Sequence, residues 1–452
     1  MTDAELIARY DGRVPRYTSY PTAPHFTPAV GPDRYAAWLG QLPAGLPLSL
    51  YLHVPFCERL CLYCGCNTGV VRHAAPRRAY AALLERELRL VAGRVGRRRV
   101  SHVHWGGGTP TTLPADCLTD VMALIRDLFD LTPDAEIAIE LDPTALPADR
   151  LAALAAMGVT RVSLGVQDLD PAVQAAIGRI QSYEVTEACA QAVRGIGVSA
   201  INLDLIYGLP LQTEQSVAET ARRALRLEAG RVAVFGYAHV PWMKRHQALI
   251  PEATLPGPQA RFDQRAAIGR VLEEEGGYLP VGLDHYARPD DALAEAAQGR
   301  RLHRSFQGYT TDAAPALIGI GASAIGCLPQ GYVQNATAVP DYAAAIRAGH
   351  AATARGIALS ADDRLRRAVI EQVMCDLRAD LPDLARAHQA DPAPLLAAAA
   401  SLASFERDGL VRRDGGLVQV TEIGRPFVRN VAAVFDAYLN KNDTRPRHAQ
   451  AV

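Results

Sequence analysis

Six short apolar segments alternate with Ala- and Leu-rich stretches from residue 48 onward, and most of these segments end in glycine, proline or a polar residue. The intervening stretches, such as 80–93 and 149–158, carry apolar residues at helical spacing. Such a series of βα units predicts a parallel sheet covered by helices, either an open α/β sheet or a full or partial (β/α) barrel. Because the polar residues gather at the carboxyl ends of the strands, where barrels place their chemistry, the pattern favours the barrel. The expected strands are 48–55, 100–110, 136–143, 161–168, 200–210 and 231–241, with 278–289 as a further candidate.

The composition changes twice along the chain. Residues 1–47 are rich in proline and tyrosine, and we expect them to form an ordered arm because aromatic side chains are frequent there. Residues 48–345 carry the βα rhythm and are expected to form the barrel domain. Helices dominate residues 346–452, where 404–424 has the helix, strand, DGG turn and strand typical of a winged helix. We expect this third domain to be a cap on the barrel.

Charge and cysteine usage limit the possible partners and compartment. Lys and Arg number 47 against 48 Asp and Glu, and acidic residues interrupt the arginines of 404–424, so we expect no nucleic-acid partner. The first residues are too polar for a signal peptide, and no apolar run is long enough to span a bilayer. Four of the eight cysteines are scattered and four are crowded, which indicates a reducing compartment with a metal or redox site. The expectation is a cytoplasmic protein, and its size and charge are compatible with a monomer.

The crowded cysteines lie in FCERLCLYCGC, residues 56–66, directly after the first expected strand. They are Cys57, Cys61, Cys64 and Cys66. Thiolates at such spacings can converge on one iron–sulfur cluster, and three of them would leave one iron open. The alternative is a zinc site that uses all four. Zinc sites usually combine two cysteine pairs from distant segments, and four ligands within ten residues would crowd the tetrahedron.

The Cys-x₃-Cys-x₂-Cys motif after the first strand resembles the radical S-adenosylmethionine (SAM) superfamily. Within it, the chain resembles the oxygen-independent coproporphyrinogen III oxidase family from about Arg16 to Leu439. The blocks that carry this resemblance are PRYTSYPTA, SLYLHVPFCERLCLYCGC, HWGGGTPT, IELDP, GVQD, LDLIYGLP, DHYARPDD and HRSFQGYTT. The resemblance implies that Cys57, Cys61 and Cys64 bind a [4Fe–4S] cluster whose fourth iron binds SAM. It also implies that Cys66 is a catalytic-site neighbour and no ligand.

The resemblance also implies the SAM contacts. Backbone at the GGG run can approach the methionine amino group, the polar strand-end residues can bind amino and ribose groups, and Arg179 can pair with the SAM carboxylate. Without the resemblance, the simpler explanation is that the glycines form a tight turn and that the polar residues cap surface elements or form ordinary ion pairs. Phe56, Phe306 and Gln307 are expected near a second SAM molecule. The full expected set is Tyr51, Phe56, Gly107, Gly108, Thr109, Glu140, Gln167, Arg179, Asp204, Ala238, Phe306, Gln307 and Ile325.

The substrate that the resemblance implies is coproporphyrinogen III. A 5′-deoxyadenosyl radical takes hydrogen from the β carbon of a propionate, and loss of an electron and CO₂ leaves a vinyl group. Two such reactions give protoporphyrinogen IX for haem synthesis, and an electron donor such as flavodoxin or ferredoxin is implied. Tyr20 in the arm is expected to touch the substrate region. Arg16, Arg288 and Arg304 stand in family-like blocks as candidates for the propionates, although structural ion pairs explain them equally well.

Other polar residues are weaker candidates. Four histidines fall near strand ends or in matched blocks, where a hydrogen-bonded core histidine is the commoner explanation; they are His53, His104, His239 and His303. Gly178 and Gly236 stand where the family usually has asparagine, which removes two side-chain amides near the SAM region.

Two other functions remain open from the sequence. One is a radical SAM enzyme acting on another tetrapyrrole, and the other is a haem-binding trafficking protein without turnover of SAM. The retained arm, the HRSFQGYTT block and Cys66 count against both.

Overall fold

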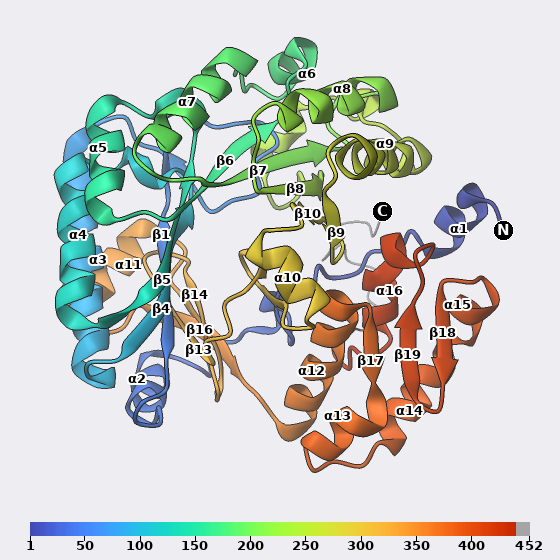
Figure 1. Ribbon diagram of the computed structural model, residues 1–452. Helices are drawn as coiled ribbons and strands as arrows, with labels where there is room; N and C mark the ends of the chain where they lie inside the picture. Colours follow the sequence, from blue (N-terminus) through green and yellow to red (C-terminus); the bar gives the residue numbers. More distant parts are fainter. Residues whose placement is uncertain (440–452) are drawn as a thin grey trace.

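A twelve-stranded sheet forms the centre of the computed structural model, which describes residues 1–439 (Figure 1). Its order is β16–β15–β14–β13–β1–β4–β5–β6–β7–β8–β10–β9, so the two ends of the sheet do not meet. The six strands expected from the sequence are the parallel middle of this sheet, which confirms the α/β class and the partial barrel. They are β1 (Leu48–Val54), β4 (Arg99–Gly107), β5 (Asp130–Leu141), β6 (Arg161–Gln167), β7 (Ala200–Tyr207) and β8 (Arg231–Gly236).

Helices cover the outer face of these strands (Figure 1). The reason is visible in β6 and β7, where buried and half-buried residues alternate along each strand. The apolar set packs against the helices, and the other set, which includes Ser163, Gln167, Asn202 and Asp204, faces the interior of the barrel. The outer helices are α3 (Ala74–Val95), α4 (Ala115–Leu128), α5 (Ala148–Met157), α6 (Pro171–Ala176), α7 (Tyr183–Gly195), α8 (Glu214–Leu225) and α9 (Pro258–Arg270).

The sheet continues on both sides of its parallel middle. The candidate strand at 278–289 is a hairpin of two short strands, β9 and β10, of which β10 pairs antiparallel with β8. On the other side β13 pairs parallel with β1, and three antiparallel strands follow it. The added elements are β9 (Leu279–Val281), β10 (His285–Ala287), α10 (Ala292–Gln298), β11 (His303–Ser305), β12 (Gly308–Thr310), β13 (Ala316–Ile320), β14 (Ile325–Leu328), β15 (Gly331–Asn335), α11 (Val339–Arg347) and β16 (Thr353–Ala358).

The C-terminal region has its own apolar core and a three-stranded sheet, in the order β17–β19–β18. The two strands expected at 404–424 are present, joined by the DGG turn in which Gly415 and Gly416 have φ of +54° and +94°. Residues 440–452 of the expected third domain lie outside the described residues. The elements are α12 (Ala361–Asp376), β17 (Arg378–Asp380), α13 (Leu381–Ala387), α14 (Ala393–Ala399), α15 (Ala403–Arg407), β18 (Val411–Asp414), β19 (Leu417–Val420) and α16 (Val428–Ala433).

The N-terminal arm contains α1 (Asp3–Tyr10) and α2 (Pro32–Gly40) and contacts the C-terminal region. Leu6, Tyr10 and Val14 share an apolar cluster with Leu410 and Phe427. Farther along the arm, the buried side chains of Tyr17 and Tyr20 belong to the core of the C-terminal region. The arm is therefore ordered by packing against a segment almost four hundred residues away.

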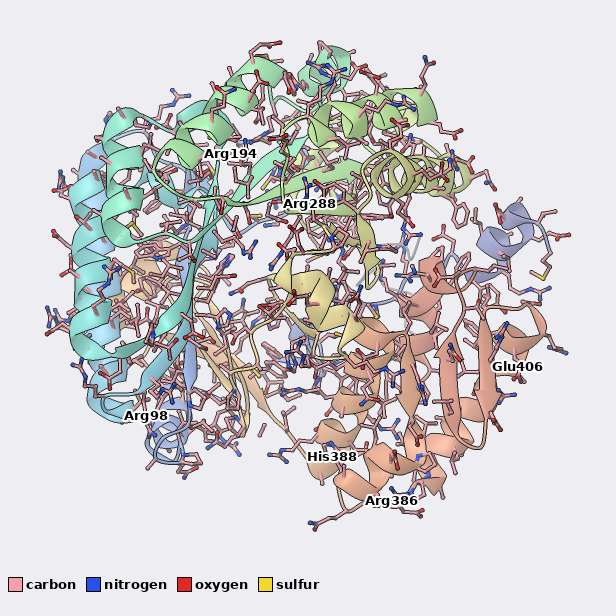
Figure 2. The ribbon with its side chains drawn as sticks, in the orientation of Figure 1. Arg98, Arg194, Arg288, Arg386, His388 and Glu406 are labelled. Atoms are coloured by element: carbon pink, nitrogen blue, oxygen red, sulfur yellow. The ribbon has the colours of Figure 1, made fainter. Side chains whose placement is uncertain are left out.

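Arginine side chains donate hydrogen bonds to backbone carbonyls in several loops of this fold. Arg98 donates to the Leu42 carbonyl at 3.0 Å, and Arg194 donates to the Glu228 carbonyl at 3.2 Å (Figure 2). Both carbonyls lie in turns directly after helices, so these bonds fix the segments that follow α2 and α8. Among the described residues, no helix combines the length and apolar character needed to cross a membrane.

Candidate active site

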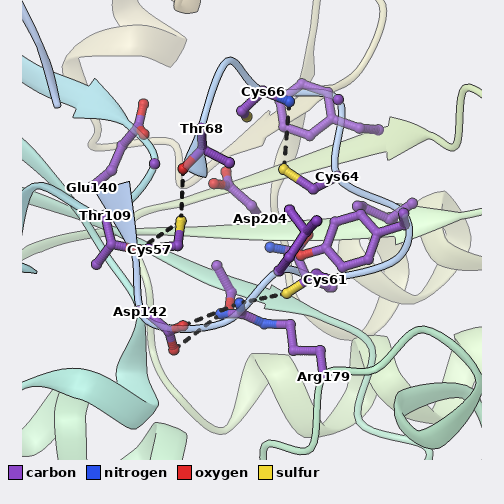
Figure 3. Close-up of a pocket in the computed structure, with 18 of the residues that line it drawn as sticks. Cys57, Cys61, Cys64, Cys66, Thr68, Thr109, Glu140, Asp142, Arg179 and Asp204 are labelled. Atoms are coloured by element: carbon purple, nitrogen blue, oxygen red, sulfur yellow. Dashed lines mark hydrogen bonds and ion pairs between the residues drawn. The ribbon is translucent and has the colours of Figure 1, made fainter. Parts of the chain in front are cut away.

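A cavity of about 490 Å³ lies at the carboxyl ends of the six parallel strands. We call it the cysteine cavity, because all four cysteines of residues 57–66 line it (Figure 3). Most of the remaining lining comes from the cysteine loop itself and from β4 to β8 with the segments that follow them, as expected for a parallel (β/α) fold, and Arg16 of the arm also contributes. Of the expected cofactor residues it includes Gly107, Gly108, Thr109, Glu140, Gln167, Arg179, Asp204 and Ala238.

A segment after β8 holds the cysteine loop from outside. Lys244 donates to the carbonyl of Cys66 at 2.8 Å, and the His246 ring nitrogen lies 2.8 Å from the carbonyl of Cys64. Gln247 donates to the carbonyl of Tyr63 at 2.8 Å. No sequence motif indicated these three residues. They stand in the polar run KRHQ, residues 244–247, which resembles none of the motifs described above.

The cysteine thiols have different surroundings. The Cys57 sulfur lies 3.1 Å from Thr68 Oγ1 and 3.7 Å from Thr109 Oγ1, while burial raises the pKa of its thiol. The Cys61 sulfur lies 3.6 Å from Arg179 Nη1. The cavity therefore presents one thiol beside two hydroxyls and one beside a cation.

Cys64 and Cys66 interact directly. The Cys66 amide donates to the Cys64 sulfur at 3.4 Å. A hydrogen bond between the two side chains lowers the pKa of Cys64 to about 6 and raises the pKa of Cys66. The geometry shows the Cys66 amide pointing at the Cys64 sulfur, which favours negative charge on that sulfur. The amide contact is compatible with the prediction that Cys64 is a ligand, and the role of Cys66 stays a prediction.

The donor set fits a [4Fe–4S] cluster. Cys57, Cys61 and Cys64 supply soft sulfur ligands from one loop to one cavity. Each thiolate of such a cluster binds a different iron atom. Within residues 1–439 no three His, Cys, Asp or Glu side chains are placed so that they could hold one metal ion.

The glycine run after β4 is required by close packing. Gly107 has a φ of +115°, and a Cβ there would lie 2.7 Å from the His53 ring. A Cβ on Gly108 would lie 2.6 Å from the Phe56 carbonyl oxygen. No other residue fits, because both contacts are shorter than real Cβ contacts. The Gly107 amide is bonded to Glu140 Oε2 at 3.0 Å, so the run also orients that carboxylate.

Charged and strained residues complete the cavity wall. Burial and the neighbouring Glu140 raise the pKa of Asp204 to about 7. Arg179 donates to the Gly165 carbonyl at 2.8 Å and pairs with Asp142 at 3.3 Å. Gln167 has a φ of +66°, an uncommon conformation for a residue other than glycine and one that collects at binding sites.

Five expected site residues do not line the cysteine cavity. Tyr51 is bonded to His53 Nδ1 at 3.0 Å behind the glycine run, Phe56 is buried, and Ile325 begins β14. Phe306 and Gln307 line a second cavity of about 220 Å³, which we call the arm cavity because residues 17–20 form one side of it.

Tyr20 also lines the arm cavity rather than the cysteine cavity. Its side chain is almost fully buried, and its hydroxyl accepts a hydrogen bond from the Ala437 amide at 3.0 Å. In this structure Tyr20 joins the arm to the C-terminal region.

The three candidate arginines lie in different places. Arg16 lines the cysteine cavity and Arg304 lines the arm cavity. Arg288 follows β10, with a half-exposed side chain 4.0 Å from Asp290 (Figure 2). Arg288 lines neither cavity.

The candidate histidines mostly have structural partners. His53 is bonded through both ring nitrogens, to Tyr51 and to the Asn67 carbonyl, and His303 lies 3.0 Å from Glu371. His239 lies 3.0 Å from the Tyr237 hydroxyl. His104 lies 3.4 Å from Glu140 Oε1, at the edge of the site.

The two departures from the family pattern have local explanations. Gly178 has a φ of +66°, which glycine and asparagine both adopt readily. At Gly236 a Cβ would lie 2.9 Å from the Tyr207 hydroxyl and 3.3 Å from Arg261 Nη2. These two side chains therefore occupy the space next to residue 236.

Comparisons with known proteins agree over the whole chain. Residues 51–224 match the model of the radical SAM superfamily, and residues 359–427 match that of the HemN C-terminal domain. The oxygen-independent coproporphyrinogen III oxidase of Bradyrhizobium diazoefficiens is 50% identical, over 99% of this chain and 100% of its own. The enzyme of that name from Escherichia coli is 41% identical, over 97% and 96%. The solved structure of E. coli coproporphyrinogen III oxidase (HemN), a radical SAM enzyme, superposes with a TM-score of 0.90 at 40% identity, covering 97% of this chain and 99% of that one.

Proposed function

This chain belongs to the oxygen-independent coproporphyrinogen III oxidase family of radical SAM enzymes, as its motifs predicted, and we propose that it performs that family's reaction. The reaction is the oxidative decarboxylation of two propionate side chains of coproporphyrinogen III to vinyl groups. Its product, protoporphyrinogen IX, is used in haem synthesis.

The observation that carries the proposal is the convergence of residues 57–66 with the strand-end polar residues in one cavity. The cysteines come from the loop after β1, and Glu140, Gln167 and Asp204 come from three other strands. Side chains so far apart in sequence meet because parallel strands end at the same edge of the sheet. A cluster bound by three thiolates and SAM beside these polar groups explains the arrangement.

The residues of the chain would hold and orient the cluster and SAM. Bound [4Fe–4S] cluster and SAM supply the radical that removes a propionate hydrogen. Cys57, Cys61 and Cys64 would bind the cluster, while Glu140 and Asp204 offer acceptors to the amino and ribose groups of SAM. Arg179, fixed by Asp142 and the Gly165 carbonyl, offers a cation to its carboxylate.

We further propose a second SAM in the arm cavity, which Phe306 and Gln307 line. The proposed electron donor is a small reducing protein such as flavodoxin or ferredoxin. The chain is proposed to act as a cytoplasmic monomer in which residues 346–452 cap the barrel. A sedimentation measurement on the reconstituted protein tests the monomer.

The function is tested by anaerobic reconstitution with iron and sulfide, followed by reductant, SAM and coproporphyrinogen III. We expect 5′-deoxyadenosine together with protoporphyrinogen IX. Formation of 5′-deoxyadenosine without the vinyl product would indicate another substrate. Formation of neither, by protein with the absorbance of a full cluster, would contradict radical SAM activity.

A further inference from the structure

Four buried or cavity-facing arginines from three parts of the chain gather beside the cysteine cavity. Arg16 belongs to the arm, Arg261 to α9, Arg304 to β11 and Arg429 to α16. Asp284, directly before β10, is the carboxylate that interacts with several of them, and its pKa is held below the usual range despite burial because Arg304, His285 and Arg16 stabilise its charge. The cluster therefore holds more positive than negative charge.

Two of these arginines hold the main chain of the arm. Arg429 Nε donates to the Pro15 carbonyl at 3.0 Å, and its Nη2 donates to the Val14 carbonyl. Arg304 donates to the Arg16 carbonyl through Nε at 3.3 Å and Nη2 at 3.2 Å. The backbone of residues 14–16 is thus fixed from two sides, by groups that are themselves buried.

The side chain of Arg16 projects into the cysteine cavity from this fixed backbone. Its Nη2 donates to the Gly236 carbonyl at 2.8 Å. In the part of the chain that the structure describes, no carboxylate oxygen lies within 4.0 Å of its guanidinium nitrogens, whereas Arg179 in the same cavity is paired with Asp142. Although Arg16 is exposed to the open cavity, the surrounding protein and the charges of Arg304 and Arg261 lower its pKa.

A cation in such a place is stabilised by an anion that enters the cavity. Neighbouring arginines repel its charge, and a carboxylate both offsets that charge and matches the guanidinium fork with two hydrogen bonds. The proposed substrate carries four propionates. Three arginines line the cavity: Arg179 is paired with Asp142, Arg59 donates to the Thr144 hydroxyl at 2.9 Å, and Arg16 lies beside further positive charge. Of the three, Arg16 is therefore the cation that an incoming carboxylate would stabilise most.

We propose that Arg16 binds a propionate carboxylate of the tetrapyrrole and that Arg304 and Arg429 are positioning residues that hold it over the cavity. This inference rests on the proposed function and names the residue that recognises the substrate. It reassigns Arg304, which the sequence suggested as a direct propionate ligand, to a role through the arm backbone. Arg288, at the half-exposed position, has no part in recognition.

The test compares Arg16→Gln with Arg13→Gln. Arg13 lies in the same arm, is exposed and stacks over Trp242 at 5.4 Å, so its variant removes the same charge away from the cavity. Binding of coproporphyrin III, the fluorescent oxidised form of the substrate, is measured by titration on reconstituted protein, and SAM binding is measured separately. We expect Arg16→Gln to weaken coproporphyrin III binding about tenfold or more, the usual effect of losing a charge-assisted hydrogen bond.

Three further results are expected from the same variants. The KM for coproporphyrinogen III rises more than kcat falls in Arg16→Gln, Arg16→Lys recovers part of the loss, and SAM affinity is unchanged. Coproporphyrin III tetramethyl ester, which carries no charge on its propionates, binds wild type and Arg16→Gln alike. Arg13→Gln behaves as wild type in each measurement.

The contrary outcomes are equally distinct. Unchanged coproporphyrin III binding and unchanged KM in Arg16→Gln would overturn the proposal, as would a parallel loss of SAM affinity, which would assign Arg16 to the SAM carboxylate instead. If wild-type enzyme cleaves SAM without decarboxylating coproporphyrinogen III, the proposed function fails. Even then, comparing the binding of coproporphyrin III and of its tetramethyl ester to wild type and to Arg16→Gln shows whether Arg16 binds a carboxylate.

Discussion

At the scale of single residues, the site depends on which of two neighbouring cysteines binds iron. Cys64 and Cys66 are two positions apart, and the Cys66 amide donates to the Cys64 sulfur at 3.4 Å. Spacing alone left all four cysteines as possible ligands. The amide contact stabilises negative charge on the Cys64 sulfur, and iron binds cysteine as thiolate.

Serine substitution separates the two roles. We expect Cys64→Ser to lose the absorbance of the reconstituted [4Fe–4S] cluster, because a ligand is removed. Cys66→Ser is expected to keep that absorbance while the rate of decarboxylation falls. Iron content and visible absorbance after identical reconstitution measure both effects. Loss of the cluster in both variants would contradict the division into three ligands and one neighbour.

At the scale of elements, one buried carboxylate on α3 joins three segments. Glu87 accepts hydrogen bonds from the Gly321 amide at 2.6 Å, from Asn335 Nδ2 at 2.7 Å and from the Tyr342 hydroxyl at 2.7 Å. These donors lie after β13, at the end of β15 and in α11. Glu87 therefore fastens the antiparallel extension of the sheet to a helix of the parallel part, close to the carbonyl of His53 on β1.

Replacement of Glu87 by Gln is expected to change how stability depends on pH. Burial raises the pKa of Glu87 from 4.5 to about 7, so between these values the folded protein binds more protons than the unfolded chain. The wild-type free energy of unfolding therefore falls as pH rises through this window, by at most about 3 kcal/mol from this group. The glutamine variant lacks this contribution. Midpoints of thermal unfolding at pH 5 and pH 8 should show a larger decrease for wild type than for Glu87→Gln.

The variant Glu85→Gln is a matched control, because Glu85 lies on the same helix and is only partly buried. Its profile should follow that of wild type. If the profile of Glu87→Gln also ran parallel to wild type, the carboxyl of Glu87 would not titrate in this window.

At the scale of the whole molecule, the N-terminal arm is held by the C-terminal region while its Arg16 faces the barrel. Tyr17 donates to Asp436 at 3.0 Å, Tyr20 accepts from the Ala437 amide, and Arg429 binds two arm carbonyls. Arg16 then donates to Gly236 at the end of β8. The C-terminal region thus holds the arm segment that contributes Arg16 to one side of the site.

Loss of the Arg429 side chain is expected to loosen the arm. Two charge-assisted hydrogen bonds to buried carbonyls disappear in Arg429→Gln, each worth roughly 1.5–3 kcal/mol in typical proteins. Trypsin should then cleave after the exposed Arg13 several times faster than in wild type, as followed by mass spectrometry of the N-terminal fragment. Arg386→Gln removes an exposed arginine paired with Asp383 in the same region and should leave cleavage unchanged (Figure 2). Equal cleavage of Arg429→Gln and wild type would mean that other contacts hold the arm.

Local patterns were sufficient for the strands, the class of fold and the cysteine motif. Alternation in β6 and β7 and the glycine and polar residues at strand ends reflect interactions with immediate neighbours, which spacing records. Of the thirteen SAM contacts that the family resemblance implied, eight line the cysteine cavity. Contacts between residues distant in sequence are not visible in such local patterns. Phe306, Gln307 and Tyr20 belong to the arm cavity, and Lys244, His246 and Gln247 hold the cysteine loop from a segment with no recognisable motif.

The sequence by itself determined the parallel sheet, the cysteine motif and the family, because these depend on residue type at short spacing. Only the tertiary structure decided which arginine faces the cavity. Arg16, Arg288 and Arg304 look alike in the sequence, yet one enters the cavity, one is half-exposed and one binds the arm backbone. The physical reason is that a guanidinium takes its role from the carbonyls and carboxylates around it, and for Arg16 and Arg304 these partners come from segments hundreds of residues away.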